Sequence, residues 1–361
     1  MKQKARTVIG CLLVLFILAI LLIETASAQE KKSITLNYAV VFPPTGVYAE
    51  GIKWWAGEVN KRTEGSLTIK IHWGGALARS MEMAEAVRTG TADIGDTVWA
   101  PYLPEKLPMH IIADYAIPFH RKPLASWLAV EQLAKEFPEF DGELAANNMR
   151  RLTYYGVGNP HLITRKEIRT IGDLKGMKIR CSGKIHPNVL KAVGVVPMFI
   201  PSAEAYDALH KGVVDGSTCT SQWAVDYKYY EAARYLTKVG LGGDPGMGAM
   251  INLDVWKKLP KQIQEVLLKL REEYPIVYAE ADYKQTEMSY PILTNAGVKI
   301  VDPPASELET WKNLPQVKAL PEEWAKFAAD KAKVPLSRTN EILKRYGELR
   351  EKFGKLYPKE W

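Results

Sequence analysis

The chain has 361 residues, of which 47% are hydrophobic and 10% aromatic, and its 48 basic and 41 acidic side chains give a formal net charge of +7 at pH 7. This length predicts two domains with substantial cores, and the apolar content excludes a disordered protein. A positive excess this small, spread over many pairs of opposite charge, excludes a nucleic-acid-binding surface and is compatible with an anionic ligand.

The first 28 residues have the pattern of a secretory signal peptide. Three basic residues precede an apolar run over 8–23, and Ala26-Ser-Ala28 fits a cleavage site. This run of 16 residues is shorter than the roughly 20 residues of a membrane-spanning helix, so cleavage near Ala28 is preferred to an uncleaved anchor. The pattern therefore predicts export of the mature chain.

Strands and helices alternate through the next part of the chain. Alternating β-forming residues predict strands over 33–41 and 67–73, and apolar residues at helical spacing predict helices over 47–62 and 80–88. Strands that alternate with helices in this way pair in parallel. The same reasoning predicts the later elements, which are helices over 124–137, 187–193, 202–211 and 223–235 and strands over 177–181, 195–200 and 298–301.

A short motif occurs twice and indicates two similar lobes. Ala86-Val-Arg-Thr-Gly-Thr-Ala-Asp93 aligns without gaps with Ala208-Leu-His-Lys-Gly-Val-Val-Asp215. In each copy the glycine fits the left-handed residue that ends a helix, and a short strand follows. Each copy also comes after a strand that ends in a glycine-rich turn, which makes two related α/β units the economical interpretation.

The predicted fold class is α/β, a two-lobed clamp with a mostly parallel sheet in each lobe. We expect a signal peptide over 1–28, lobe 1 over 29–150 with return segments near 235–252, lobe 2 over 151–234, a long bridging helix and a returning strand within 253–320, and a C-terminal helical extension over 321–361. Breaks in the long helix are allowed at Pro260 and Pro275. Several crossings between the lobes make a hinge, so that the crevice can close on a ligand.

The C-terminal extension carries one apolar stripe. Ile342, Tyr346, Leu349, Phe353 and Leu356 recur at spacings of four and three residues. Such a stripe usually docks on its own domain, and we therefore expect a monomer. A dimer contact through this helix is the alternative.

Arg180 is the principal candidate for ligand binding. It lies near the end of the predicted strand 177–181, which Gly176 and Gly183 delimit. In open α/β sheets, ligands bind beyond the carboxyl ends of the strands, and a guanidinium offers a planar fork that matches a carboxylate. A surface ion pair is the alternative interpretation.

Four motifs in order give the chain a resemblance to a known family. They are Asp173-Leu-Lys-Gly-Met-Lys-Ile-Arg180, Ala208-Leu-His-Lys-Gly-Val-Val-Asp-Gly216, Tyr230-Glu-Ala-Ala-Arg-Tyr-Leu236 and Asn252-Leu-Asp-Val-Trp-Lys-Lys-Leu-Pro260. Together with Gly90-Thr-Ala-Asp-Ile-Gly95 and the exported start, they resemble the solute-binding proteins of tripartite ATP-independent periplasmic (TRAP) transporters over essentially the whole mature chain.

The resemblance implies a periplasmic clamp, crossed by a long helix, that holds an organic acid in its closed cleft. It implies delivery of that acid to the small and large membrane subunits of a permease that uses an ion gradient. It also implies that Arg180 grips the ligand carboxylate.

Two subfamily patterns within that family are not met. Members that bind sialic acid have an asparagine at the position of Cys219 and a second arginine at Pro160 or His161, whereas members that bind 2-oxo acids through a metal have an acidic residue and Trp at Thr218 and Cys219. A sugar acid and a metal-bridged oxo acid are therefore not expected, and we predict no metal and no cofactor.

Seven further residues are candidates for lining the pocket: His161, Thr218, Cys219, Trp99, Phe42, Trp223 and Met247. The histidine is a donor at a strand start or else the cap of a loop, and Thr218 and Cys219 end one strand and are expected to face the same crevice. The aromatic residues would cover an apolar ligand body, with ordinary core packing as the alternative, and the methionine would be an adaptable contact. This set is poor in charge and suggests a monocarboxylate with an apolar or aromatic body.

The sequence predicts a binding protein rather than an enzyme. Its six histidines show no metal-ligand spacing, and it has no G-x-S-x-G turn and no phosphate-binding glycine loop. The alternatives are the solute-binding protein of an ATP-driven importer and an exported hydrolase. For Cys181 and Cys219, two separate buried thiols are preferred to a disulfide, which an exported chain would allow.

Overall fold

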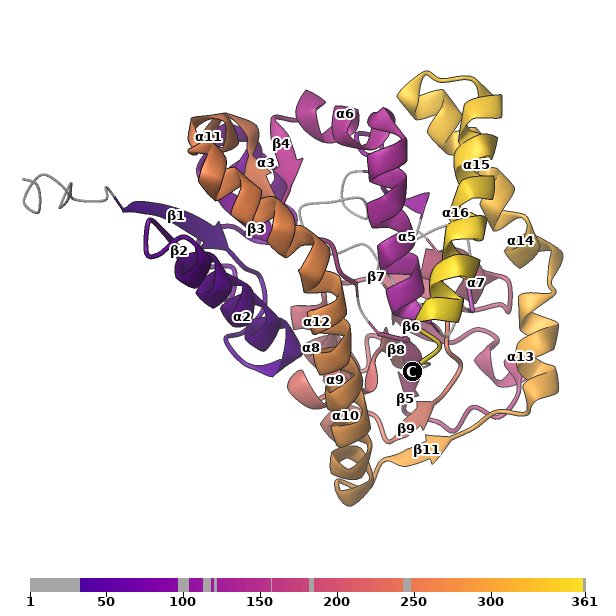
Figure 1. Cartoon of the computed structure of the whole chain (residues 1–361). Coiled ribbons are helices and arrows are strands. Elements are labelled where there is room, and N and C mark those ends of the chain that lie inside the picture. Colours follow the sequence, from indigo (N-terminus) through magenta and orange to yellow (C-terminus); the bar gives the residue numbers. More distant parts are fainter. Residues whose placement is uncertain are drawn as a thin grey trace, which may run out of the picture.

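Two β-sheets, each flanked by helices, form the two lobes of the molecule (Figure 1). The computed structural model describes residues 33–96, 104–112, 118–119, 122–156, 158–181, 185–242 and 248–359. The predicted signal peptide and the candidate residues Trp99 and Met247 lie outside these ranges. Within them, no helix combines the length and the apolar character needed to span a membrane.

The first sheet has five strands in the order β2-β1-β3-β10-β4. They are β1 (Ile34–Ala39), β2 (Leu67–His72), β3 (Ile94–Asp96), β4 (Met149–Arg151) and β10 (Ala249–Asn252). Strand β1 pairs in parallel with β2 and β3, whereas β10 runs antiparallel to β3 and β4. The predicted α/β lobe is confirmed, but its sheet is mixed rather than mostly parallel, because a strand from the returning chain is inserted between β3 and β4.

The second sheet has six strands in the order β11-β9-β5-β8-β6-β7. They are β5 (His161–Thr164), β6 (Lys178–Cys181), β7 (Val196–Phe199), β8 (Gly216–Cys219), β9 (Tyr235–Thr237) and β11 (Lys299–Val301). Strands β7, β6 and β8 are parallel neighbours, while β5 is antiparallel to β8 and β9. This sheet is also mixed, since β5 enters it directly from lobe 1.

The repeated motif has the predicted local structure in both lobes. Helix α3 (Met83–Thr89) ends at Gly90 with φ of 80°, and helix α8 (Ala205–His210) is followed by Gly212 with φ of 73°. Only glycine adopts this left-handed conformation without strain. Strands β3 and β8 follow and lie inside their sheets.

One predicted boundary differs from the structure. We expected the return to lobe 1 to begin near residue 235, but β9 belongs to the second sheet and only β10 joins the first. In sequence the stretch 235–252 is a single extended run. The chain leaves one lobe and enters the other within it, which no local pattern indicates.

The long helix is α12 (Lys261–Asn295), and it contacts α2 (Gly46–Arg62) of lobe 1 and α9 (Ser221–Asp226) of lobe 2 (Figure 1). The short α11 (Leu253–Lys258) precedes it, so the break allowed at Pro260 occurs, whereas Pro275 lies inside continuous helix. A proline there removes one backbone hydrogen bond. The buried neighbours Tyr274 and Tyr278 hold this part of the helix by packing.

The approach of α2 to α12 is unusually close at Gly51. A Cβ atom added to this glycine would lie 2.7 Å from Tyr274 Oη and 3.0 Å from Tyr278 Cδ2. Any other residue would therefore require the Tyr274 and Tyr278 side chains to shift.

The remaining helices complete the two lobes and the C-terminal extension. They are α5 (Pro123–Glu136), α6 (Pro138–Ala146), α7 (Ile185–Lys191), α10 (Tyr229–Ala232), α13 (Ala305–Lys312), α14 (Pro315–Lys318), α15 (Leu320–Ala332) and α16 (Leu336–Leu356). Helix α16 lies along α5, and its stripe residues Ile342, Tyr346 and Leu349 are buried there (Figure 1). The first three positions of the stripe dock on their own chain, whereas Phe353 is half-buried and Leu356 is 62% exposed.

Two apolar cores lie on opposite faces of the second sheet. The larger begins in lobe 1, continues past α12 and includes Cys219 and Trp223. The smaller contains Leu162, Ile179 and Cys181. These cores identify which side of each strand faces the centre of the clamp.

Candidate functional site

Arg180 is buried at the carboxyl ends of three parallel strands. Its side chain is 1% exposed. Nε donates to the Ile200 carbonyl at 2.6 Å, just beyond β7, Nη1 donates to the Thr218 carbonyl of β8 at 3.3 Å, and Nη2 donates to Ser202 Oγ at 2.8 Å. The surface ion pair that was the alternative is not formed: within the described ranges no carboxylate pairs with this guanidinium.

The hydrogen bonds of Arg180 leave part of its donor set unused. A guanidinium has five N–H groups, and three are engaged by the acceptors just named. One N–H on each terminal nitrogen has no acceptor among the described residues. A parallel pair of donors on Nη1 and Nη2 is the arrangement that a carboxylate accepts two bonds at a time.

Strand register determines which candidate side chains share the Arg180 side of the sheet. Arg180 is opposite Ser217 in the β6–β8 pair, and Cys219 is opposite His161 in the β5–β8 pair. Successive side chains point to opposite faces of a strand. Arg180, Cys219 and His161 therefore share one face, which differs from our expectation that Thr218 and Cys219 face the same crevice. Thr218 contributes its carbonyl to Arg180 instead of its hydroxyl to the crevice.

Both cysteines are free, buried thiols on opposite faces of the sheet. Burial raises the pKa of Cys219 to about 12, against a smaller opposite effect of the nearby Arg180 charge, and raises the pKa of Cys181 to about 11. Both side chains stay protonated at neutral pH. A protonated thiol is a poor nucleophile and acts as a small, weakly polar surface.

His161 connects three parts of the molecule. The backbone N–H of Gly240 donates to Nδ1 at 3.3 Å, so the neutral ring carries its proton on Nε2, which lies 3.3 Å from Tyr290 Oη of α12. The ring is 5% exposed. It thus links the start of β5, the segment after β9 and the long helix, on the same face of the sheet as Arg180.

Phe42 and Trp223 meet in one aromatic cluster that spans both lobes. Phe42 stacks on Tyr48 with ring centroids 4.4 Å apart, and Tyr48 lies 6.1 Å from Trp223 and 5.8 Å from Tyr278 of α12. Phe42 follows β1 in lobe 1, whereas Trp223 belongs to α9 in lobe 2. Both rings are more than nine-tenths buried, so they form part of the larger core in this structure.

His186 is a residue of this region that the sequence analysis missed. It lies at the start of α7 and is 2% exposed. Burial lowers its pKa to about 4; a hydrogen bond with the Gly242 backbone opposes this shift, and the Arg180 charge adds to it. A buried, neutral imidazole therefore lies within reach of the Arg180 charge. The available signal was its position six residues after Arg180, because a histidine without metal-ligand spacing gives no other.

The described residues contain no group of three or more histidine, cysteine, aspartate or glutamate side chains placed to hold a metal ion. The polar groups gathered near Arg180 are instead neutral donors and acceptors around one cation. Such a set can bind an organic anion through its charge and a few directed hydrogen bonds.

Comparison with known proteins gives the same architecture. A solute-binding protein of Verminephrobacter eiseniae is 28% identical over 247 residues, covering 68% of this chain and 71% of that protein. A TRAP periplasmic solute-binding protein from Desulfovibrio salexigens is 25% identical, with a TM-score of 0.75 over 89% of this chain and 97% of that structure. One from Bordetella bronchiseptica with bound mandelate is 24% identical, with a TM-score of 0.78 over 89% of this chain and 99% of that structure.

The sequence profile of one family covers most of the chain. It matches residues 38–328, from the first strand to α15, and thus both lobes and the long helix. This chain belongs to the bacterial extracellular solute-binding proteins of family 7, the DctP family.

Proposed function

We propose that this protein is the periplasmic receptor of a TRAP transporter and that it binds an organic monocarboxylate with an apolar or aromatic body. The observation that carries the proposal is Arg180, a buried cation at the strand ends whose partners among the described residues are all neutral. A buried charge without an opposite charge is costly. A carboxylate ligand supplies that charge.

Similar structures support this ligand class. Besides the mandelate complex, structures from Bordetella pertussis and from a marine metagenome contain pyroglutamic acid and meta-hydroxyphenylacetate. Each of these ligands has one carboxylate on a compact body. The aromatic cluster around Tyr48 and the protonated Cys219 thiol would cover such a body better than a second charge.

We further infer that His186 forms the second polar contact with the ligand. It is buried and neutral, and its pKa is lowered by burial and by the nearby Arg180 charge. A hydroxyl or amide next to the carboxylate would satisfy it. Ligands such as mandelate, with a hydroxyl on the carbon that carries the carboxylate, should therefore be preferred to phenylacetate.

Location and transport partners belong to the same proposal. The N-terminal signal pattern supports export with cleavage near Ala28, and the family match supports a role in solute capture. Two membrane subunits of a TRAP permease would receive the ligand after hinge closure. Genes for these two subunits beside this one would support that partner, whereas genes for an ATP-driven permease would favour the other importer class.

The test is calorimetric titration of the mature chain with mandelate, phenylacetate and pyroglutamate. Arg180→Ala should lower the affinity for every ligand that binds by at least about 100-fold, because a charged hydrogen-bonded pair is lost. The matched control is Arg169→Ala, which removes an exposed arginine of the same lobe that pairs with Glu167. Unchanged affinity in the Arg180 variant, or equal losses in both variants, would refute the assignment.

A further inference from the structure

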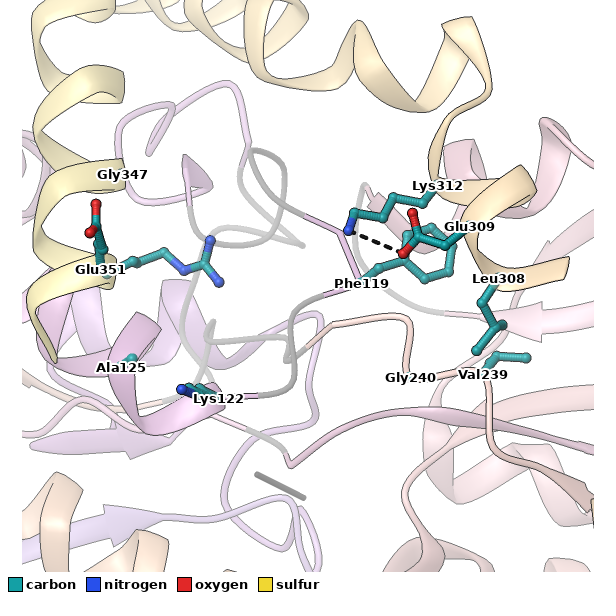
Figure 2. Close-up of a pocket in the computed structure, with 11 residues that line it drawn as sticks. Phe119, Lys122, Ala125, Val239, Gly240, Leu308, Glu309, Lys312, Gly347 and Glu351 are labelled. Carbon is teal, nitrogen blue, oxygen red and sulfur yellow. Dashed lines mark ion pairs between the residues drawn. The ribbon is translucent and has the colours of Figure 1, made fainter. Parts of the chain in front are cut away.

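A second charged cavity lies apart from Arg180, between the two lobes. Its volume is about 530 Å³, and neither Arg180, Cys219 nor His186 lines it. One wall comes from the start of α5 and from α16. The other comes from α13 and from Val239 and Gly240, which follow β9 (Figure 2).

The two walls belong to different lobes. Helix α16 packs on α5, which contacts α6 and α12 on the lobe 1 side, whereas α13 packs on the short helix η1 (Ile171–Leu174) of lobe 2. The cavity also adjoins the candidate ligand site, because Gly240 donates to His161. Anything bound here would touch both sides of the clamp.

Three cations converge on this cavity. Lys122 and Arg350 come from the lobe 1 side and Lys312 from the opposite wall. Lys122 Nζ donates to the Gly354 carbonyl at 3.2 Å, and Arg350 Nε donates to Ser126 Oγ at 2.9 Å. Over the described part of the chain, neither of these two side chains has an acidic partner, and burial lowers the pKa of Arg350.

The two acidic residues in the lining are already engaged. Glu351 pairs with Lys355 at 2.7 Å. Glu309 pairs with Lys312 at 3.5 Å, as the dashed line in Figure 2 marks. The amino-terminal end of α5, at Lys122, also faces this space with no acidic residue in its first turn. The positive end of the helix dipole thus adds to the charge of Lys122 and Arg350.

We propose that this cavity is a second anion site, specific for a compact oxyanion with two or more negative charges, which bridges the lobes. Arg350 presents Nη1 and Nη2, whose donors have no acceptor among the described residues, and Lys122 and Lys312 approach from either side. Inorganic phosphate or sulfate and a small organic polycarboxylate share the required chemistry, because each offers several anionic oxygens to separate cations.

The experiment is titration of the mature chain with phosphate, sulfate and citrate in chloride buffer at constant ionic strength. At least one of these anions should bind with one-to-one stoichiometry. Tighter binding of phosphate or sulfate would indicate an inorganic ligand, and tighter binding of citrate would indicate an organic one. Arg350→Gln should weaken binding about tenfold or more, and Lys312→Gln about threefold, since each removes one charged contact. Arg180→Ala should leave binding unchanged, which separates this site from the proposed carboxylate site.

Two controls keep the test decisive. The Lys312 side chain is 53% exposed, so its substitution leaves the fold intact even if the Arg350 variant is unstable. Lys326→Gln removes an exposed lysine of α15, outside the cavity, whose side chain is 62% exposed. The proposal is overturned if none of the three anions binds, if Lys312→Gln binds them as well as the unaltered chain, or if Lys326→Gln weakens binding equally.

Discussion

Arg151 in lobe 1 and Arg180 in lobe 2 are both buried, with 0% and 1% of their surface exposed, but their surroundings differ. Arg151 Nε lies 3.3 Å from Glu131 Oε1, and the other oxygen of Glu131 accepts from Arg271 Nε at 2.8 Å. Arg180 donates to two carbonyls and one hydroxyl. Lobe 1 supplies a carboxylate to its buried arginines, whereas no carboxylate of the described residues pairs with Arg180 in lobe 2.

The lobe 1 cluster of Glu131, Arg151 and Arg271 has a carboxylate of its own, although Nη1 and Nη2 of Arg151 have no hydrogen-bond partner within the described residues. Burial alone would raise the pKa of Glu131, but the charges of Arg151 and Arg271 outweigh burial and lower it. The carboxylate therefore stays ionised and fixes both arginines. Burial of an arginine does not by itself mark a binding site; burial without a carboxylate does.

The largest expected effect is a loss of stability when the ion pairs of Glu131 with Arg151 and Arg271 are broken. Glu131→Gln leaves Arg151 and Arg271 buried without the carboxylate that both contact, and we expect the free energy of unfolding to fall by about 3–5 kcal/mol. Urea denaturation measures this, and the folded variant should bind carboxylates as before. Glu272→Gln, which removes an exposed partner of Lys135, is the control and should cost under about 1 kcal/mol. If Glu131→Gln instead weakened ligand binding and left the free energy of unfolding unchanged, the ligand would have to be assigned to lobe 1 rather than to Arg180.

A change in pH should also change the free energy of unfolding, through Glu143 of lobe 1. Burial raises the pKa of Glu143 to about 8, so between its unfolded pKa near 4.3 and about 8 the folded chain holds a proton that the unfolded chain releases. Stability therefore falls as pH rises through this window. His110, whose pKa burial lowers well below its usual range, acts in the opposite direction only below about pH 6.5.

The measurement compares urea denaturation of the unaltered chain and Glu143→Gln between pH 6.5 and 8. Over that interval the unaltered chain should lose about 2 kcal/mol relative to the variant. Carboxylate affinity should stay constant, because the titrating group lies in the other lobe. Parallel stability curves for the two chains would show that Glu143 is ionised throughout.

A smaller effect should appear in lobe 2 at His186. His186→Phe keeps a ring but removes both polar atoms, and we expect mandelate affinity to drop about tenfold while phenylacetate affinity changes little, because only mandelate has a hydroxyl for the imidazole. Calorimetric titration of the unaltered chain and of the His186 variant with each ligand measures these affinities. An equal drop for the two ligands would assign His186 to packing alone.

The smallest effect concerns the orientation of Arg180. Ser202→Ala removes the acceptor of Nη2, so the guanidinium is less well fixed, and we expect a loss of about 1 kcal/mol in carboxylate binding. Ser306→Ala, at an exposed serine of α13, is the matched control. Tighter binding in the Ser202 variant would mean that this hydroxyl competes with the ligand for the guanidinium.

Local patterns account for what the sequence predicted well. Alternation at period two located β6 and put Arg180 near its end, and Gly90 and Gly212 ended two helices because only glycine adopts their φ angles easily. These signals depend on neighbouring residues alone. They sufficed for the α/β class, for both lobes and for the position of the principal candidate.

The features that the sequence did not predict depend on contacts between distant segments. The ion pair of Arg271 with Glu131 joins residues 140 positions apart, and the insertion of β10 between β3 and β4 is equally long-range. The orientation of Thr218 followed from a register that sequence does not specify. His186 has an ordinary sequence context, and only its burial beside Arg180 marks it as a candidate.

The contact at Gly51 limits which residue can stand where α2 packs on α12. Because Tyr274 Oη and Tyr278 Cδ2 lie so near this glycine, the two helices leave no space there for even one further carbon atom. A larger residue at 51 would therefore have to displace Tyr278, whose ring lies 5.8 Å from Tyr48, so a substitution on the outer helix of lobe 1 would reach the aromatic cluster that joins the two lobes.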